Sequence, residues 1–425
     1  MPDPSAVTET HRPFPGMRVV AGGFLILTTG AGLGFYGLAV YLNALSKEKG
    51  WDVGALSLGT TVFFVVSGFT GLAVARMIAQ SDARRAVLVG AVIGAVALLL
   101  LGRVTAIWQL YLVYALYGVG FSAAGLVTVT TVVTRWYHRR RAMAISVAST
   151  GLSFGGVALT PAMKWFVDEQ GMAGATPWLA LIFLFGCALP GWFLLRSDPA
   201  ELGFLPDGER AVVGSAPPLL SGTPYREALK SRFFFTVSLG YVLSLGSQVG
   251  GIQQLVKLAE ERTTASTAAF ATLALAVTSI VARLLGGKVF PNYPLARVIT
   301  VLSFFQMIAL VGMGLSQSAV LLFAFIILFG ATVGNILMMQ PLLIAERFGV
   351  REYPRLFSRT QFVSLIGVAG GPWLLGWLHD VAGGYETAYV VAGVMSLAGV
   401  FVFIIGGPAE NTSDHTDGSL EAQPV

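Results

Sequence analysis

Long apolar runs, separated by short polar segments, repeat along the whole chain. Each run has about twenty residues or more, enough for an α-helix to cross about 30 Å of hydrocarbon. The pattern predicts six spans in the first part of the chain, at residues 17–45, 55–78, 86–103, 107–135, 141–167 and 177–196. It predicts six more in the second part, at residues 232–259, 266–288, 295–315, 319–346, 355–381 and 385–407. The fold class predicted is therefore an all-α integral membrane protein with twelve transmembrane helices.

The polar segments divide the chain into two halves of six helices each. We expect an N-terminal segment, a first half, a linker rich in proline, glycine and charge, a second half and a C-terminal tail, at residues 1–16, 17–196, 197–231, 232–407 and 408–425. The fifth and eleventh spans carry a glycine pair, a proline, a tryptophan, an aspartate and a glycine in the same order. This shared order of residues indicates that the halves are pseudo-symmetric repeats, as in many transporters.

Composition and charge agree with a membrane location. Of the 425 residues, 55% are hydrophobic and 12% charged, a balance that soluble proteins do not have. The net charge of +5 does not indicate a nucleic-acid partner, because the basic residues form short clusters between the apolar runs. Twenty of the 27 lysines and arginines fall on the side that carries both termini, which predicts that this side is cytoplasmic. We expect a multi-pass protein of a bacterial inner (cell) membrane.

Catalytic motifs are missing or misplaced. Residues 151–155 match a hydrolase elbow, but they fall in the middle of an apolar span instead of at a strand-to-helix turn. Val289 stands where a phosphate loop after Lys288 would need Ser or Thr. The four histidines show no metal-ligand spacing. The sequence therefore predicts no enzyme, no metal, no cofactor, and transport without ATP hydrolysis.

Arg283 is the most informative polar residue inside a span. A guanidinium at membrane depth costs at least about 2.5 kcal/mol to insert, so it indicates a functional site. The alternative is that its side chain snorkels to the headgroups nearby. None of the 22 Asp and Glu residues falls in the middle of a span, so no fixed counter-ion is predicted. Because arginine binds a carboxylate with two parallel hydrogen bonds, the pattern favours a small anionic substrate and disfavours cations.

Other polar residues within spans are candidate substrate ligands beside Arg283. They are Tyr36, Tyr117, Gln248 and Asn335. Tyr117 shares a helix face with Tyr114 at three-residue spacing, which equally indicates packing between helices.

Three short motifs add a family resemblance. They are Arg135-Trp136-Tyr137-His138-Arg139-Arg140-Arg141-Ala142-Met143-Ala144 before the fifth span, Gly34-Phe35-Tyr36 in the first and Val281-Ala282-Arg283 in the eighth. Together they resemble the monocarboxylate transporters and the related oxalate/formate antiporters of the major facilitator superfamily. The resemblance implies the major facilitator fold, Arg283 as the carboxylate-binding arginine, and proton-coupled or exchange transport of lactate-like anions.

The resemblance also points to gating and coupling residues. Family members often have an aspartate where this chain has Ser279, and a lysine where it has Tyr36, and both positions are tied to proton coupling. Charged residues of the loop after the second span and of the matching loop in the second half are further gating candidates: Asp82, Arg84 and Glu346. The sequence itself adds His379 and Asp380 at one helix end as coupling candidates, because no Asp, Glu or His is embedded in a span.

These features predict a secondary active transporter of a small organic anion that works by alternating access. Its partners would be the lipid bilayer, the anion and, for symport, a proton, while anion exchange is equally compatible. Two alternatives stay open: an exporter of hydrophobic or drug-like compounds, and a non-transporting sensor built on a transporter fold. The sequence does not specify the substrate, the direction, the coupling ion or the oligomeric state.

Overall fold

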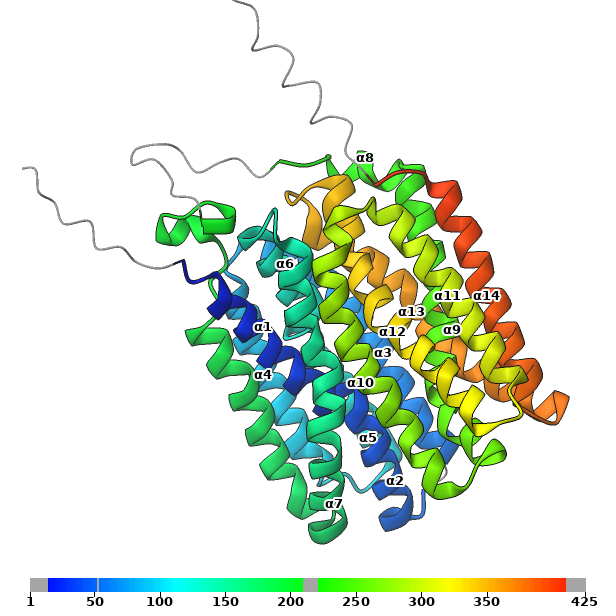
Figure 1. Cartoon of the computed structure of the whole chain (residues 1–425). Helices are drawn as coiled ribbons and strands as arrows, with labels where there is room; N and C mark the ends of the chain where they lie inside the picture. The colour runs from blue at the N-terminus through cyan, green and yellow to red at the C-terminus, as the bar shows by residue number, and fades with distance from the viewer. Residues whose placement is uncertain (1–13, 52, 209–220, 410–425) are drawn as a thin grey trace, which may run out of the picture.

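The computed structural model describes residues 14–51, 53–208 and 221–409, and these are almost entirely helical (Figure 1). Most of the predicted tail, most of the N-terminal segment and residues 209–220 of the predicted linker lie outside the described residues. The first half contains α1 (Gly16–Gly30), η1 (Ala31–Tyr36), α2 (Gly37–Lys49), α3 (Val53–Gln80), α4 (Ala83–Leu101), α5 (Ile107–Ala123), α6 (Leu126–Trp136) and α7 (Arg141–Phe193). Short helices follow in the connecting segment: η2 (Pro199–Leu202), η3 (Pro206–Gly208) and α8 (Tyr225–Lys230). The second half contains α9 (Arg232–Arg262), α10 (Ala265–Val289), η4 (Phe290–Asn292), α11 (Leu295–Leu315), α12 (Ala319–Phe348), α13 (Tyr353–Ala382) and α14 (Tyr385–Gly406).

The helices confirm the predicted all-α membrane fold. In the described part of the chain, eleven helical segments are long and apolar enough to cross a membrane. One of them, α7, has 53 residues, or about 80 Å of helix, which is too long for a single crossing. Its backbone breaks at Gly171, where φ is 67° and ψ is 173°. The predicted fifth and sixth spans are therefore the two arms of α7, and the described part of the chain makes twelve crossings.

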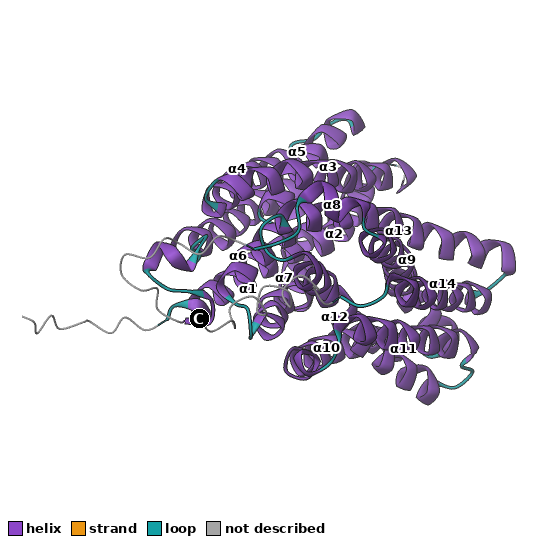
Figure 2. Cartoon of the chain, turned by 90° about the horizontal axis from the view of Figure 1, so that it is seen from above, coloured by secondary structure: helices purple, strands orange, loops and turns teal. Residues whose placement is uncertain are grey.

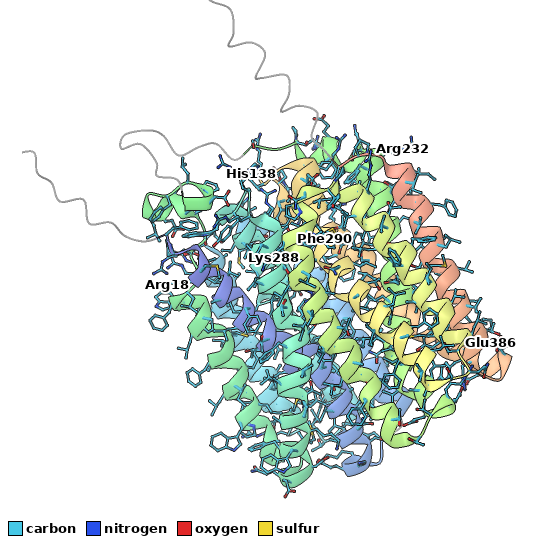
Figure 3. The ribbon with its side chains drawn as sticks, in the orientation of Figure 1. Arg18, His138, Arg232, Lys288, Phe290 and Glu386 are labelled. Carbon is cyan, nitrogen blue, oxygen red and sulfur yellow. The ribbon has the colours of Figure 1, made fainter. Side chains whose placement is uncertain are left out.

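The two halves lie side by side (Figure 2). Seen along the bundle, α1 to α7 form one group and α9 to α14 the other. The described chain enters α1 and leaves α14 at the same end of the bundle (Figure 1), which we call the terminal end, and the opposite end the distal end. Arg18, His138 and Arg232 lie toward the terminal end, whereas Glu386 lies at the distal end (Figure 3).

Two of the predicted continuous spans are interrupted in mid-membrane. The first contains the π-helical turn η1, and the fourth breaks between α5 and α6 at Gly125, whose backbone is extended at φ −95° and ψ −169°. Carbonyls freed by the interruptions find hydroxyl donors: Tyr41 donates to the Leu33 carbonyl at 3.0 Å and Thr128 to the Ala123 carbonyl at 2.8 Å. Such breaks persist at membrane depth where they line a cavity or are buried in protein.

The halves touch each other on the terminal side of the membrane centre. A Cβ on Gly287 of α10 would lie 2.6 Å from the Ser146 Cβ of α7, so only glycine permits this approach. On the other flank, the rings of Phe69 in α3 and Phe362 in α13 have centroids 4.9 Å apart. These contacts close the terminal end of the interface between the halves.

The connecting segment is anchored to both halves at the terminal end. Carboxylate oxygens of Asp207 accept hydrogen bonds from the backbone amides of His138, Arg139 and Arg140 at 3.1, 2.7 and 3.3 Å. Further along, the Ser221 carbonyl accepts from the amides of residues 350 and 351 at 3.1 and 3.2 Å. The two ends of this segment are thereby tied to the loop before α7 and the loop before α13.

Candidate functional site

A central cavity of about 260 Å³ lies between the halves at the interrupted helices. Its lining comes from α1, η1, α5, α6 and α7 of the first half and from α9, α10, α12 and α13 of the second. The residues are Leu27, Gly30, Ala31, Phe35, Tyr36, Phe121, Ala124, Gly125, Leu126, Leu152, Ser153, Leu245, Gln248, Val249, Ile252, Arg283, Val333, Leu337, Gln361 and Val368. Because both halves contribute to the lining, a ligand bound here would contact both.

A second pocket of about 350 Å³, which we call the distal pocket, extends this cavity. It shares Phe35, Val249 and Val368 with the central cavity and continues along α2, α3 and α9 toward the distal end. The halves are in contact on the terminal side, so the distal side is the route by which a solute would reach the cavity in this conformation.

Arg283 lies in the cavity wall with 1% of its surface exposed, and does not snorkel to the membrane surface. Its Nε donates to the Gly334 carbonyl of α12 at 2.8 Å, and its Nη1 donates to the Ser149 carbonyl of α7. Nη2 has no hydrogen-bond partner among the described residues. The guanidinium is therefore held by main-chain dipoles and keeps one amino group free to bind a ligand.

The bonds around Arg283 join the two halves. Besides the guanidinium bond to Ser149, the Ser146 hydroxyl of α7 donates to the Arg283 carbonyl of α10. Both α7 serines belong to the first half, and Arg283 belongs to the second. Any separation of the halves on the terminal side has to break these two bonds.

The cavity has a single charge. Among the described residues that line it, Arg283 alone carries a charged side chain, and no carboxylate is present. An isolated guanidinium in a low-dielectric environment attracts an anion much more strongly than it would in water. With no carboxylate among the described lining residues, the arrangement suits one negative charge on a bound molecule.

Two further predicted ligands, Tyr36 and Gln248, line the same cavity. Tyr36 ends η1 and packs edge-on against Phe35, with ring centroids 5.1 Å apart. Gln248 of α9 is 4% exposed, and its Oε1 has no hydrogen-bond partner among the described residues. The structure thus brings Arg283, Tyr36 and Gln248 together from three helical segments.

Three predicted residues lie outside the cavity lining. Tyr117 is packed within the first half between Phe63 and Phe183, with ring centroids 5.4 and 5.5 Å away. Asn335 donates to carbonyls of residues 282 and 331 at 3.1 and 2.8 Å, and so ties α12 to α10. Ser279 lies one turn before Arg283 on α10 and is 1% exposed, and its hydroxyl has no hydrogen-bond partner within the described ranges.

The candidate gating pair Asp82 and Arg84 forms a cluster at the terminal end. Asp82 caps α4 and accepts from the Arg84 backbone amide at 3.0 Å, from its Nε at 2.7 Å and from the Ser197 hydroxyl at 2.5 Å. Partial burial raises the pKa of the Asp82 carboxyl, but these hydrogen bonds outweigh burial and lower the pKa to about 2. Glu201 lies 3.8 Å from the Arg84 guanidinium, and burial raises the pKa of its carboxyl.

The other gating and coupling candidates lie at opposite ends of the molecule. Glu346 lines a terminal-end pocket of about 690 Å³ together with Arg139 and Arg141, and this pocket is formed by both halves. At the distal end, His379 Nε2 lies 3.1 Å from Glu261 and His379 Nδ1 lies 3.1 Å from Asp380. None of these residues lines the central cavity.

Several lining residues escaped sequence reasoning. Gln361 of α13 and Ser153 of α7 are polar residues within spans, and the same depth argument that selected Gln248 could have found them. Phe35 and Phe121 had no such signal, because aromatic residues occur on every face of a membrane helix.

Comparison with known proteins identifies the family. The model of the Major Facilitator Superfamily matches residues 24–341 and, in a second match, residues 255–424. The chain belongs to the Major Facilitator Superfamily. It is accordingly an integral, multi-pass membrane transporter of a small molecule, and not an enzyme.

Relatives with curated names point the same way. Monocarboxylate transporter 13 of Bos taurus is 26% identical over 326 residues, which cover 76% of this chain and 73% of that protein. Monocarboxylate transporter 11 of Homo sapiens is 25% identical over 418 residues, which cover 92% of this chain and 82% of that protein. The resemblance expected from the three motifs is thereby confirmed.

Solved structures confirm the fold. The Escherichia coli fucose:proton symporter aligns with a TM-score of 0.69 at 13% identity, covering 92% of this chain and 98% of the symporter. The human organic anion transporter MFSD10 aligns with a TM-score of 0.70 at 15% identity, covering 92% of this chain and 100% of that one. The membrane-crossing helices of the described chain are therefore arranged as in other major facilitator transporters.

Proposed function

We propose that this transporter carries a small organic monoanion, of the monocarboxylate kind, whose carboxylate binds Arg283. The observation that carries the proposal is the single, uncompensated guanidinium in the wall of a cavity lined by both halves. A carboxylate would neutralise it and could form charge-assisted hydrogen bonds with the unpartnered Nη2. The names of the monocarboxylate transporter relatives support the same class of substrate.

The transport cycle we propose is alternating access about this cavity, between a half at residues 17–196 and a half at residues 232–407. The basic terminal end would be cytoplasmic, as the distribution of lysine and arginine favours. The conformation described above, closed at the terminal end, would then face outward. Rocking of the halves would open the contacts around Gly287 and Phe69 and close the distal pocket.

Uptake into proteoliposomes tests the proposal. Purified protein is reconstituted, and accumulation of radiolabelled monocarboxylates is measured with and without a pH gradient. Arg283→Ala should abolish uptake, because the substrate charge loses its partner in a low-dielectric cavity. Stimulation by an inward proton gradient would indicate symport, whereas stimulation by internal carboxylate would indicate exchange.

Controls separate substrate binding from folding. Arg297→Ala removes an arginine from the start of α11, outside the cavity lining, and should leave uptake unchanged. Arg283→Lys keeps the charge but not the planar donor geometry, so it should retain folding and lose most uptake. Uptake by a well-folded Arg283→Ala protein would contradict the proposal.

The apolar lining supports a second candidate, export of neutral hydrophobic compounds. Such a substrate would fill the cavity without needing a cation. Transport of neutral dyes that survives Arg283→Ala, combined with absence of carboxylate uptake, would favour export over the anion proposal.

A further inference from the structure

The central cavity is larger than a two- or three-carbon acid requires. Its volume is about 260 Å³. A protein cavity of about 150 Å³ is known to accommodate benzene. The cavity therefore has room for a ring or a branched chain in addition to a carboxylate.

The walls away from Arg283 are suited to an apolar body. Apart from Arg283, the polar side chains in the lining are Tyr36, Ser153, Gln248 and Gln361, and the remaining residues are aliphatic, aromatic or glycine. Each methylene of a substrate that is transferred from water to this apolar wall would strengthen binding. A second carboxylate would find no second cation among the described lining residues.

Gln248 provides one neutral recognition group. It is 4% exposed and lines the cavity, and its amide oxygen has no hydrogen-bond partner in the described part of the chain. A buried acceptor without a partner is unfavourable, so a ligand donor that reaches it gains the bond and removes that cost. A hydroxyl can both donate to and accept from a primary amide, whichever way the amide is turned.

From these three observations we infer the substrate class: a monocarboxylate with a branched or aromatic body and one hydroxyl group that pairs with Gln248. The inference rests on the proposed function, because it assigns the carboxylate to Arg283. Aromatic and branched-chain hydroxy acids fit this description. Lactate leaves most of the apolar wall uncovered, and oxalate brings a second charge that the cavity does not neutralise.

The first test compares substrates of the wild-type protein. Uptake of 3-phenyllactate, 2-hydroxy-4-methylpentanoate, lactate and oxalate is measured at pH 7 in proteoliposomes, with protein-free liposomes to subtract passive permeation. Several additional buried methylenes should raise kcat/KM for the two bulky acids at least about tenfold above that for lactate. Oxalate should be transported worst of the four.

The second test assigns the hydroxyl to Gln248. The wild type should prefer 3-phenyllactate over 3-phenylpropionate, which lacks only the hydroxyl, by about tenfold in kcat/KM. Gln248→Leu should remove this preference while still transporting 3-phenylpropionate. The matched control is Gln306→Leu in the same half, because Gln306 is also buried but lines neither the central cavity nor the pocket that extends it, and it should leave the hydroxyl preference unchanged. Gln248→Asn, which keeps a shorter amide, serves as a second variant if the leucine variant does not fold.

Failure of this inference is distinguishable from failure of the proposed function. Transport of lactate as efficient as that of the bulky acids would overturn the size assignment, while leaving the anion proposal intact. An unchanged hydroxyl preference in Gln248→Leu would overturn the assignment of Gln248. Absence of uptake for every carboxylate would overturn the proposed function itself, and the inference with it.

Discussion

The hydroxyl of Ser146 should hold the terminal end of the transporter closed. Ser146 is fully buried on α7 of the first half, and its hydroxyl donates to the Arg283 carbonyl on α10 of the second half. Replacing Ser146 by alanine removes this bond without adding bulk. Since a buried hydrogen bond contributes about 1 kcal/mol, the ratio of open to closed molecules should rise about fivefold.

Spin labels across the terminal end measure this ratio. The chain has one cysteine, the buried Cys187, so Cys187→Ser gives a background without thiols. Labels at Arg140 and Asn292, exposed residues of the two halves, report their separation by double electron–electron resonance in lipid nanodiscs. Ser146→Ala should shift population from the short to the long distance.

The matched control is Ser396→Ala. The Ser396 hydroxyl is also fully buried, but it donates to the Ser303 carbonyl at 2.9 Å and accepts from Gln306 Nε2 at 3.2 Å, both within the second half. Its loss should lower thermal stability and leave the distance distribution unchanged. If Ser146→Ala also kept the wild-type distribution, the bond between Ser146 and Arg283 would not determine which end is open, and the reasoning would be refuted.

Two more predictions concern stability. Gly367→Ala should destabilise the second half by about 1–3 kcal/mol, because the new Cβ would lie 2.0 Å from the Val242 carbonyl oxygen. The control Gly370→Ala should be neutral or slightly stabilising, because a Cβ there would have no atom within 4 Å. Thermal melting in detergent compares the two variants. Asp82→Asn should lower the melting temperature at pH 7 through loss of the ionised partner of Arg84. Because the folded-state pKa of Asp82 is lowered to about 2, the difference in melting temperature between wild type and Asp82→Asn should stay constant from pH 8 to pH 5 and shrink only below about pH 4. A difference that disappeared already near pH 6 would contradict this assignment.

The membrane fold was predictable because its physical requirement is simple. A bilayer demands about twenty apolar residues per crossing and internal satisfaction of every backbone hydrogen bond, so the runs in the sequence located the helices. The interruptions were not predictable in the same way. The break at Gly125 and the turn η1 occur within apolar runs, and they are tolerated because neighbouring hydroxyls, such as that of Thr128, satisfy the freed carbonyls.

The candidate site was predictable in part. Polar residues are costly at membrane depth, and this signal found Arg283, Tyr36 and Gln248 in the cavity wall. The same signal selected Asn335, whose amide is instead used to join α10 to α12 through carbonyls of residues 282 and 331. A sequence shows that a polar group needs a partner, but the partner is often a main-chain carbonyl, and every residue has one.

Main-chain carbonyls, which sequence patterns do not single out, also hold the Arg283 guanidinium. An empty carrier has to hold the charge of Arg283 without a substrate, and no carboxylate in the lining is available to do so. The Gly334 carbonyl of the second half and the Ser149 carbonyl of the first half accept from the guanidinium instead. If a substrate carboxylate draws Nη1 away from Ser149, a bond between the halves is lost in the same step that fills the site. Under the proposed function, the loaded carrier would therefore open its terminal end more readily than the empty one, as alternating access requires.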